Sequence, residues 1–103
     1  MAEPVCPVER ALKIIGGKWT LLILRDLLQG PRRFSELQRS LGEVSPKTLT
    51  ERVRELEAEG ILRRTVFPEV PVRVVYELTP KGETLQDVIE AIRIWGERWS
   101  GVN

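Results

Sequence analysis

The sequence predicts a mainly α-helical fold with a small antiparallel β-hairpin, the winged helix-turn-helix. A short helical segment over residues 34–41 reaches the turn Gly42-Glu43-Val44, and a second amphipathic helix follows over residues 45–60. Two runs with strand character come next, Leu62–Phe67 and Val72–Thr79. Two helices joined by a tight, Gly-containing turn form a helix-turn-helix, and the strand pair adds the wing.

Length and composition are those of one small globular domain. With 103 residues, 42% hydrophobic and 30% charged, we expect a single winged helix-turn-helix domain over 1–103, with residues 1–5 as a flexible tail. No apolar run approaches the roughly 20 residues that span a membrane, and the acidic start is unlike a signal peptide. The single cysteine, Cys6, permits no disulfide within the chain, so a reducing cytoplasm is the expected location.

Two helices are expected before the helix-turn-helix. Pro7 suits a first helical position, where its missing N–H is not needed, so a helix is predicted over Val8–Ile15 and is broken by Gly16-Gly17. The next segment, Lys18–Leu28, is apolar on nearly all sides, which is typical of a helix buried at the centre of a domain or against a partner chain. Arg32-Arg33-Phe34 is a candidate for a short third strand.

The helix that follows Ser45 has an apolar face and a polar face. Ser45 is a good N-cap and proline fits the first turn. Leu49, Val53 and Leu56 fall on one stripe at 100° per residue and are expected to face the core. A recognition helix needs this division, because its apolar face holds it to the domain while its polar N-terminal part enters the major groove. The predicted DNA contacts in this segment are Ser45, Pro46, Lys47, Thr48, Thr50, Glu51 and Arg54.

Basic residues are concentrated where this motif would face phosphate. Residues 31–54 hold six basic and three acidic side chains, a net charge of +3, although the whole chain carries only +1. Twelve of the sixteen basic residues are arginine, which binds phosphate bidentately and reads guanine edges. Arg32, Arg33 and Ser35 are therefore further predicted contacts. Arg73, where the wing loop rejoins the strand, is expected to enter a minor groove or bind phosphate.

Apolar residues near the C-terminal end recur with a 3-4-3-4-3 spacing, which predicts a helix over 84–102 with an a/d seam. Two large tryptophans on the last helix of so small a domain bury poorly within one chain, so an identical helix of a second subunit is the expected partner. The alternative is a helix that folds back on its own domain. The predicted dimerisation residues are Trp19, Leu85, Val88, Ile92, Trp95 and Trp99, with Val102 at the end of the seam.

Enzymatic function is not expected, and neither is a cofactor or a metal. The chain has no histidine, and one cysteine with scattered carboxylates forms no zinc or catalytic cluster. The competing class is a winged helix used as a protein-interaction module without specific DNA binding. Such a module would lack basic residues at the recognition-helix start and wing, whereas Lys47, Arg54 and Arg73 favour double-stranded DNA.

The joined motifs CPVERALKIIGGKW, LLILRDLLQGPRRFSEL, SPKTLTERVRELEAEGILRR and PEVPVRVVYELTPKG resemble the HxlR family of small bacterial and archaeal winged helix-turn-helix regulators, over residues 6 to about 99. The resemblance implies a homodimer paired through terminal helices, with recognition helices (Ser45 to Arg54) in successive major grooves and wing tips (Pro68 to Arg73) in flanking minor grooves. Family members often have Pro-Pro before the wing arginine, whereas this chain has Pro71-Val72, which keeps one N–H. A sequence-specific repressor is expected, because a compact dimer without an activation surface most simply blocks polymerase.

Cys6 is the remaining chemical feature. The family often has a cysteine just before its first helix, and in some members it senses oxidants or electrophiles. A position near a helix N-terminus favours the thiolate, whereas Glu3 and Glu9 oppose it. A disulfide would need the partner subunit or a small thiol, since there is no second cysteine. The alternative is an unreactive cysteine packed against the dimer core.

Overall fold

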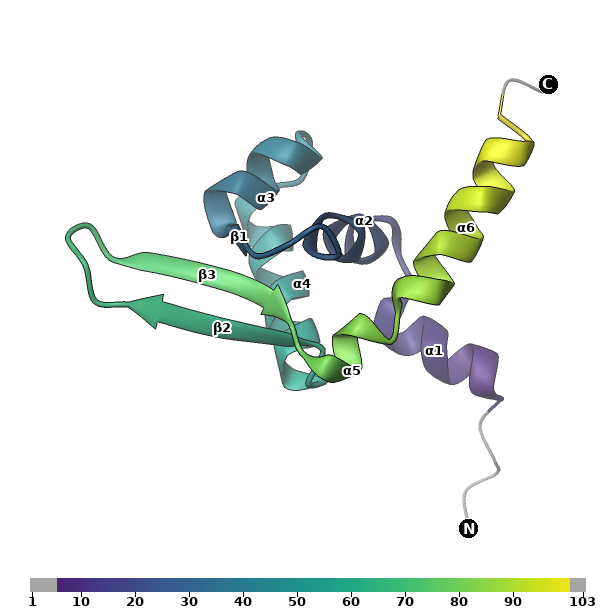
Figure 1. The fold of residues 1–103 in the computed structure, drawn as a ribbon, viewed down its shortest axis with the longest axis horizontal. Helices are drawn as coiled ribbons and strands as arrows, with labels where there is room; N and C mark the ends of the chain where they lie inside the picture. The colour runs from purple at the N-terminus through teal and green to yellow at the C-terminus, as the bar shows by residue number, and fades with distance from the viewer. Residues whose placement is uncertain (1–5, 101–103) are drawn as a thin grey trace, which may run out of the picture.

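Six helices and a three-stranded antiparallel sheet occupy residues 6–100, the part of the chain that the computed structural model describes (Figure 1). The strands are β1 (Arg32–Arg33), β2 (Leu62–Phe67) and β3 (Arg73–Leu78). This is the predicted winged helix-turn-helix. The helices are α1 (Pro7–Ile15), α2 (Lys18–Leu27), α3 (Phe34–Leu41), α4 (Pro46–Ala58), α5 (Pro80–Glu83) and α6 (Gln86–Arg98).

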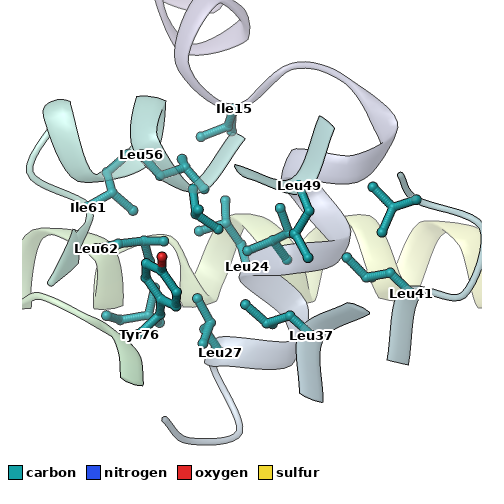
Figure 2. Packing of buried hydrophobic residues seen from close by; sticks show 14 residues of the cluster. Ile15, Leu24, Leu27, Leu37, Leu41, Leu49, Leu56, Ile61, Leu62 and Tyr76 are labelled. Carbon is teal, nitrogen blue, oxygen red and sulfur yellow. The ribbon is translucent and has the colours of Figure 1, made fainter. Parts of the chain in front are cut away.

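The hydrophobic core is arranged around α2, whose Leu24 lies at the centre of the packed side chains (Figure 2). Leu37 of α3 and Leu49 of α4 pack into the same cluster. The predicted inner stripe of α4, Leu49, Val53 and Leu56, is buried to 0–1% exposure. Complete burial of one face fixes the rotation of α4 about its own axis, so its opposite face is turned outward.

The sheet has the order β1-β3-β2, and the β2–β3 hairpin forms the wing. At its base Leu62 lies opposite Leu78, both buried, and at its tip Phe67 lies opposite Arg73. The hairpin extends away from the helices at one end of the molecule, whereas α6 projects at the other end (Figure 1). The wing tip and the last helix are therefore widely separated.

The connection from the wing to the last helix differs from the prediction. Residues 80–83 form the separate helix α5, so α6 begins at Gln86 rather than at residue 84. Thr79 leaves the strand because its hydroxyl caps α5, accepting a hydrogen bond from the N–H of Gly82 at 3.1 Å. Gly82 packs so tightly that a Cβ there would lie 2.3 Å from the carbonyl oxygen of Ile61. Four residues are too few to give a helical periodicity in the sequence.

Two expectations fall on residues outside the described range. These are the flexible tail at residues 1–5 and Val102 at the end of the seam. Among residues 6–100 no helix is long and apolar enough to cross a membrane. The same residues contain no cluster of three side chains of the metal-binding types His, Cys, Asp and Glu.

Candidate nucleic-acid interface

The start of α4 is capped as predicted. The hydroxyl of Ser45 accepts the backbone N–H of Thr48 at 3.1 Å and donates to the Thr48 hydroxyl at 3.0 Å. The bond from the N–H satisfies one of the free N–H groups of the first turn, and the bond to the hydroxyl holds the half-buried Thr48 side chain in place. Pro46 occupies the first helical position. The cap thus presents the next residues of α4 on a rigid helix end.

Three charged side chains stand on the outer face of α4. Lys47, Glu51 and Arg54 are exposed, on the side opposite the buried stripe. Two of the three are cationic, and Lys47 lies in the first turn, where the partial positive charge of the helix N-terminus also attracts anions. The outer face of α4 therefore has the shape and charge required of a major-groove element.

A groove separates α4 from the sheet, and it contains Arg64, which was not among the predicted DNA contacts. Arg64 of β2 lies in this groove together with Arg54 and Thr50 of α4. The side chain of its neighbour Arg63 is paired with Glu77 across the hairpin, at 3.3 Å. Because side chains alternate along a strand, Arg64 shares the inward face of Leu62. This alternation in the sequence could have predicted that Arg64 lies on the same face of β2 as Leu62. The groove is lined by Phe34, Thr50, Arg54, Glu57, Arg64, Val74 and Tyr76.

The wing arginine is held in a defined position. The guanidinium of Arg73 donates to the Glu69 carboxylate at 3.1 Å and lies 4.0 Å from the centre of the Phe67 ring. Stacking on the ring and pairing with the carboxylate restrict the rotamers of Arg73, which is only partly exposed. The sequence predicted the place of Arg73 but not these two partners.

The residues before the helix-turn-helix lie on β1 and in the first turn of α3. Arg32 is half-buried, and its guanidinium donates to the carbonyl of Pro31 at 2.9 Å. Arg33 is exposed, and its backbone N–H donates to the Glu36 carboxylate at 2.8 Å. Ser35 is exposed as well. The adjacent Phe34 reaches the groove beside α4, which places this segment next to the outer face of α4.

A second surface, which we call the apolar face, is formed by α1 and α6. Ile92 is 48% exposed and Trp95 is 68% exposed, although both are large hydrophobic residues. Val8 and Leu12 of α1 extend this surface beyond α6. They were not among the predicted dimerisation residues, although they stand one helical turn apart. The apolar face comprises Val8, Leu12, Val88, Ile92, Trp95 and Trp99.

Two predicted dimerisation residues pack differently from the rest. Trp19 and Leu85 are partly buried against the core of their own chain. Leu85 is the N-cap of α6 and so precedes the helical seam that it was expected to begin. The part of the seam that is exposed therefore starts at Val88.

Cys6 is exposed at the N-cap of α1. The backbone N–H groups of Glu9 and, to a smaller extent, Val8 stabilise the thiolate and lower the pKa of the Cys6 thiol below its ordinary value. Backbone N–H groups at the start of α1 therefore favour the Cys6 thiolate, as expected for a cysteine at a helix N-terminus.

Comparison with known proteins gives one consistent result. The model of the HxlR-like helix-turn-helix family matches residues 14–103. The chain is 40% identical over 100 residues to the HTH-type transcriptional regulator YodB of Bacillus subtilis, covering 96% of this chain and 89% of YodB. It is 42% identical over 95 residues to the uncharacterised HTH-type transcriptional regulator sll1512 of Synechocystis sp., covering 92% of this chain and 70% of that relative. The solved structure of the redox regulator HypR in its reduced form is similar with a TM-score of 0.90 at 39% identity, covering 94% of this chain and 96% of HypR.

Proposed function

The chain belongs to the HxlR-like helix-turn-helix family and is a transcriptional regulator of the helix-turn-helix type, and from that premise we propose that it represses transcription by binding a pseudo-palindromic operator as a homodimer. The observation that carries this proposal is the outer face of α4. It presents Lys47, Glu51 and Arg54 from a capped helix whose other face is fully buried. A module that binds only proteins has no need of cations at this position.

Each basic residue has a distinct role in the proposed complex. Lys47 binds phosphate beside the N-terminus of α4. Arg54 reads a base or binds phosphate in the major groove of the DNA. Arg64 approaches the DNA backbone from the sheet side of the protein groove beside α4. Arg73 at the wing tip contacts a flanking minor groove. Arg33 and Ser35 contact phosphate from the start of the motif.

The proposed dimer forms through the apolar face. Leaving so much hydrophobic surface in water is unfavourable, and a second copy covers it symmetrically. The wing tip lies at the end of the molecule opposite α6 (Figure 1). Two copies joined through α6 and α1 would therefore carry their wings on the outside, with both copies of α4 between them. This order matches two half-sites about one helical turn apart.

The test is fluorescence anisotropy of the protein titrated into the duplex upstream of its own gene, with a scrambled duplex in parallel, at two salt concentrations. Lys47→Ala is expected to weaken binding about tenfold and to reduce the salt slope by about 1, because one phosphate contact is lost. Lys13→Ala, which removes the same charge from an exposed position on α1, is the matched control. Equal, weak binding to both duplexes would refute specific binding to this duplex and leave a nonspecific DNA binder or a remote operator. No binding at low salt would refute DNA binding and favour the protein-interaction module.

Glu69→Gln is expected to strengthen operator binding by about threefold to tenfold, because Arg73 no longer has a competing carboxylate when it meets a phosphate. The same anisotropy assay measures it. Glu83→Gln removes an equal charge from an exposed position on α5 and serves as the control for net charge. If both variants gain affinity equally, the local pairing of Arg73 is not the cause.

We also propose that modification of Cys6 by electrophiles or oxidants changes operator affinity. Support comes from the exposure of the thiol, the backbone N–H groups that favour its thiolate, and the similarity to HypR, a redox regulator. Cys6 also adjoins Pro7 and Val8, at the edge of the apolar face. A group attached to its sulfur would therefore change the packing at the proposed subunit contact.

Alkylation of Cys6 by iodoacetamide at pH 7 is expected to be faster in the folded protein than in the urea-unfolded chain. The reason is the lowered pKa of Cys6, which gives a larger thiolate fraction at any pH below the unfolded pKa. The pH of half-maximal rate should likewise be lower when folded. Alkylated protein should bind the operator more weakly, and Cys6→Ser should bind normally without responding. Unchanged affinity after complete alkylation would exclude Cys6 as a sensor without touching the proposed DNA binding.

A further inference from the structure

A pocket lies between α1, the residue before β2, and the α5–α6 connection, and none of its residues belongs to the proposed DNA interface. Its volume is about 270 Å³, slightly below the roughly 300–1,000 Å³ typical of small-molecule sites. The size suits a small organic molecule. The lining residues are Pro7, Arg10, Ala11, Ile14, Ile15, Ile61, Lys81, Thr84 and Leu85.

The lining of the pocket combines apolar side chains with positive charge. Its walls are apolar, and its only charged residues are the two cations Arg10 and Lys81. Among residues 6–100, Arg10 forms no ion pair. The ammonium of Lys81 donates to the backbone carbonyl of Glu59 at 2.7 Å, which leaves its charge without a carboxylate partner in the same range. A matching occupant has an apolar body and one anionic group.

We propose that this pocket binds a small aromatic carboxylate and that its occupancy regulates DNA binding. The aromatic ring lies against the apolar wall formed by Ala11, Ile14 and Ile61. The carboxylate meets Arg10 and Lys81, whose charges favour it over a neutral isostere. The regulatory part of this inference rests on the proposed function, whereas the binding site itself does not.

The pocket adjoins segments that lead to α4, to the wing and to the apolar face. Lys81 is bonded to the C-cap residue of α4, Glu59, and Ile61 leads into the wing. Leu85 begins α6, and α1 carries part of the apolar face. A ligand held between these segments favours whichever relative position of α4 and α6 gives it the better contacts. Its differential affinity for two such arrangements is what shifts the affinity for DNA.

The first test uses 2-naphthoate and its neutral isostere 2-naphthamide as probes in isothermal titration calorimetry on the full chain without DNA. Naphthoate should bind at least about tenfold more tightly than the amide, because only the acid is charged. Arg10→Gln and Lys81→Met should each weaken naphthoate about fivefold or more, and Ala11→Trp should abolish binding by filling the pocket. Lys13→Gln, on the same helix and outside the lining, should bind like the parent.

The site is refuted if naphthoate does not bind at millimolar concentration, if the amide binds equally well, or if Arg10→Gln binds like the parent. Arg10 is exposed, so its replacement should leave the fold intact, which circular dichroism checks. The second test repeats the operator titration with saturating naphthoate. A change in DNA affinity of about fivefold or more supports regulation by the ligand. Unchanged DNA affinity refutes regulation but not the binding of naphthoate to the pocket. Failure of the unliganded protein to bind DNA would refute the proposed function without altering the calorimetric result.

Discussion

Replacing Ile92 with aspartate is expected to convert the proposed dimer to a monomer and to weaken operator binding about 100- to 1,000-fold, because one half-site no longer assists the other. Ile92 stands in the middle of the apolar face, 48% exposed in the single chain. In the proposed dimer an aspartate at this position would be buried without a partner, which is strongly unfavourable. No residue of α6 itself is buried in the core, so the fold of the single chain should survive the substitution.

Sedimentation equilibrium gives the mass of the Ile92→Asp variant, and anisotropy gives its affinity for the operator. Ile94→Asp is the matched control. Ile94 is exposed to a similar extent, 53%, but lies on another side of α6, beside Arg93 and Arg98. A dimeric Ile92→Asp protein, or a monomeric Ile94→Asp protein, would show that the apolar face is not the subunit contact.

Leu49→Ala should lower the free energy of unfolding by about 3–4 kcal/mol, within the range for fully buried leucines. Leu49 has 0% exposure and joins α4 to the cluster around α2. Removing its side chain leaves a cavity beneath the recognition helix, and the close packing of α2 and α3 around it limits collapse. So large a fraction of the stability of a small domain would be lost that the variant should be partly unfolded near 37 °C.

Urea unfolding at one fixed protein concentration measures this difference, since the stability of a dimer depends on concentration. Ile94→Ala, a comparable truncation at an exposed position, should change the free energy of unfolding by less than about 0.5 kcal/mol. A loss below about 1 kcal/mol for Leu49→Ala would mean that α4 is not anchored through this stripe.

The features predictable from sequence are those that are encoded locally. The boundaries of α4 follow from a cap, a proline and a stripe of three apolar residues, all within twelve positions. The wing strands follow from alternation and from the prolines between them. In each case residues close together in the sequence determine the element, so the family resemblance and the pattern of each segment predict the same fold.

The features that escaped prediction depend on how the chain folds on itself, either between separate segments or within the wing hairpin. Arg64 becomes part of the groove beside α4 only because β2 pairs with β3 in one register. The partners of Arg73 require the wing loop to bring Arg73 back to Phe67 and to Glu69 within the same hairpin. Val8 and Leu12 join the apolar face because α1 lies beside α6. Residue spacing could place Arg64 on one face of its strand and Val8 and Leu12 on one side of their helix, but only tertiary packing decides what each of these surfaces faces.

The Arg73–Glu69 pair also bears on how fast the regulator would find its site in a genome. A protein in search of an operator spends its time on unrelated sequence, where attraction is almost entirely electrostatic. Because Arg73 is already paired with Glu69, it would add little to that attraction, and each nonspecific complex would dissociate sooner. In the proposed complex, Arg73 would exchange the Glu69 carboxylate for a phosphate only when the whole interface fits the operator. In that case the Arg73–Glu69 pair would lower the final affinity for the operator but shorten the search for it.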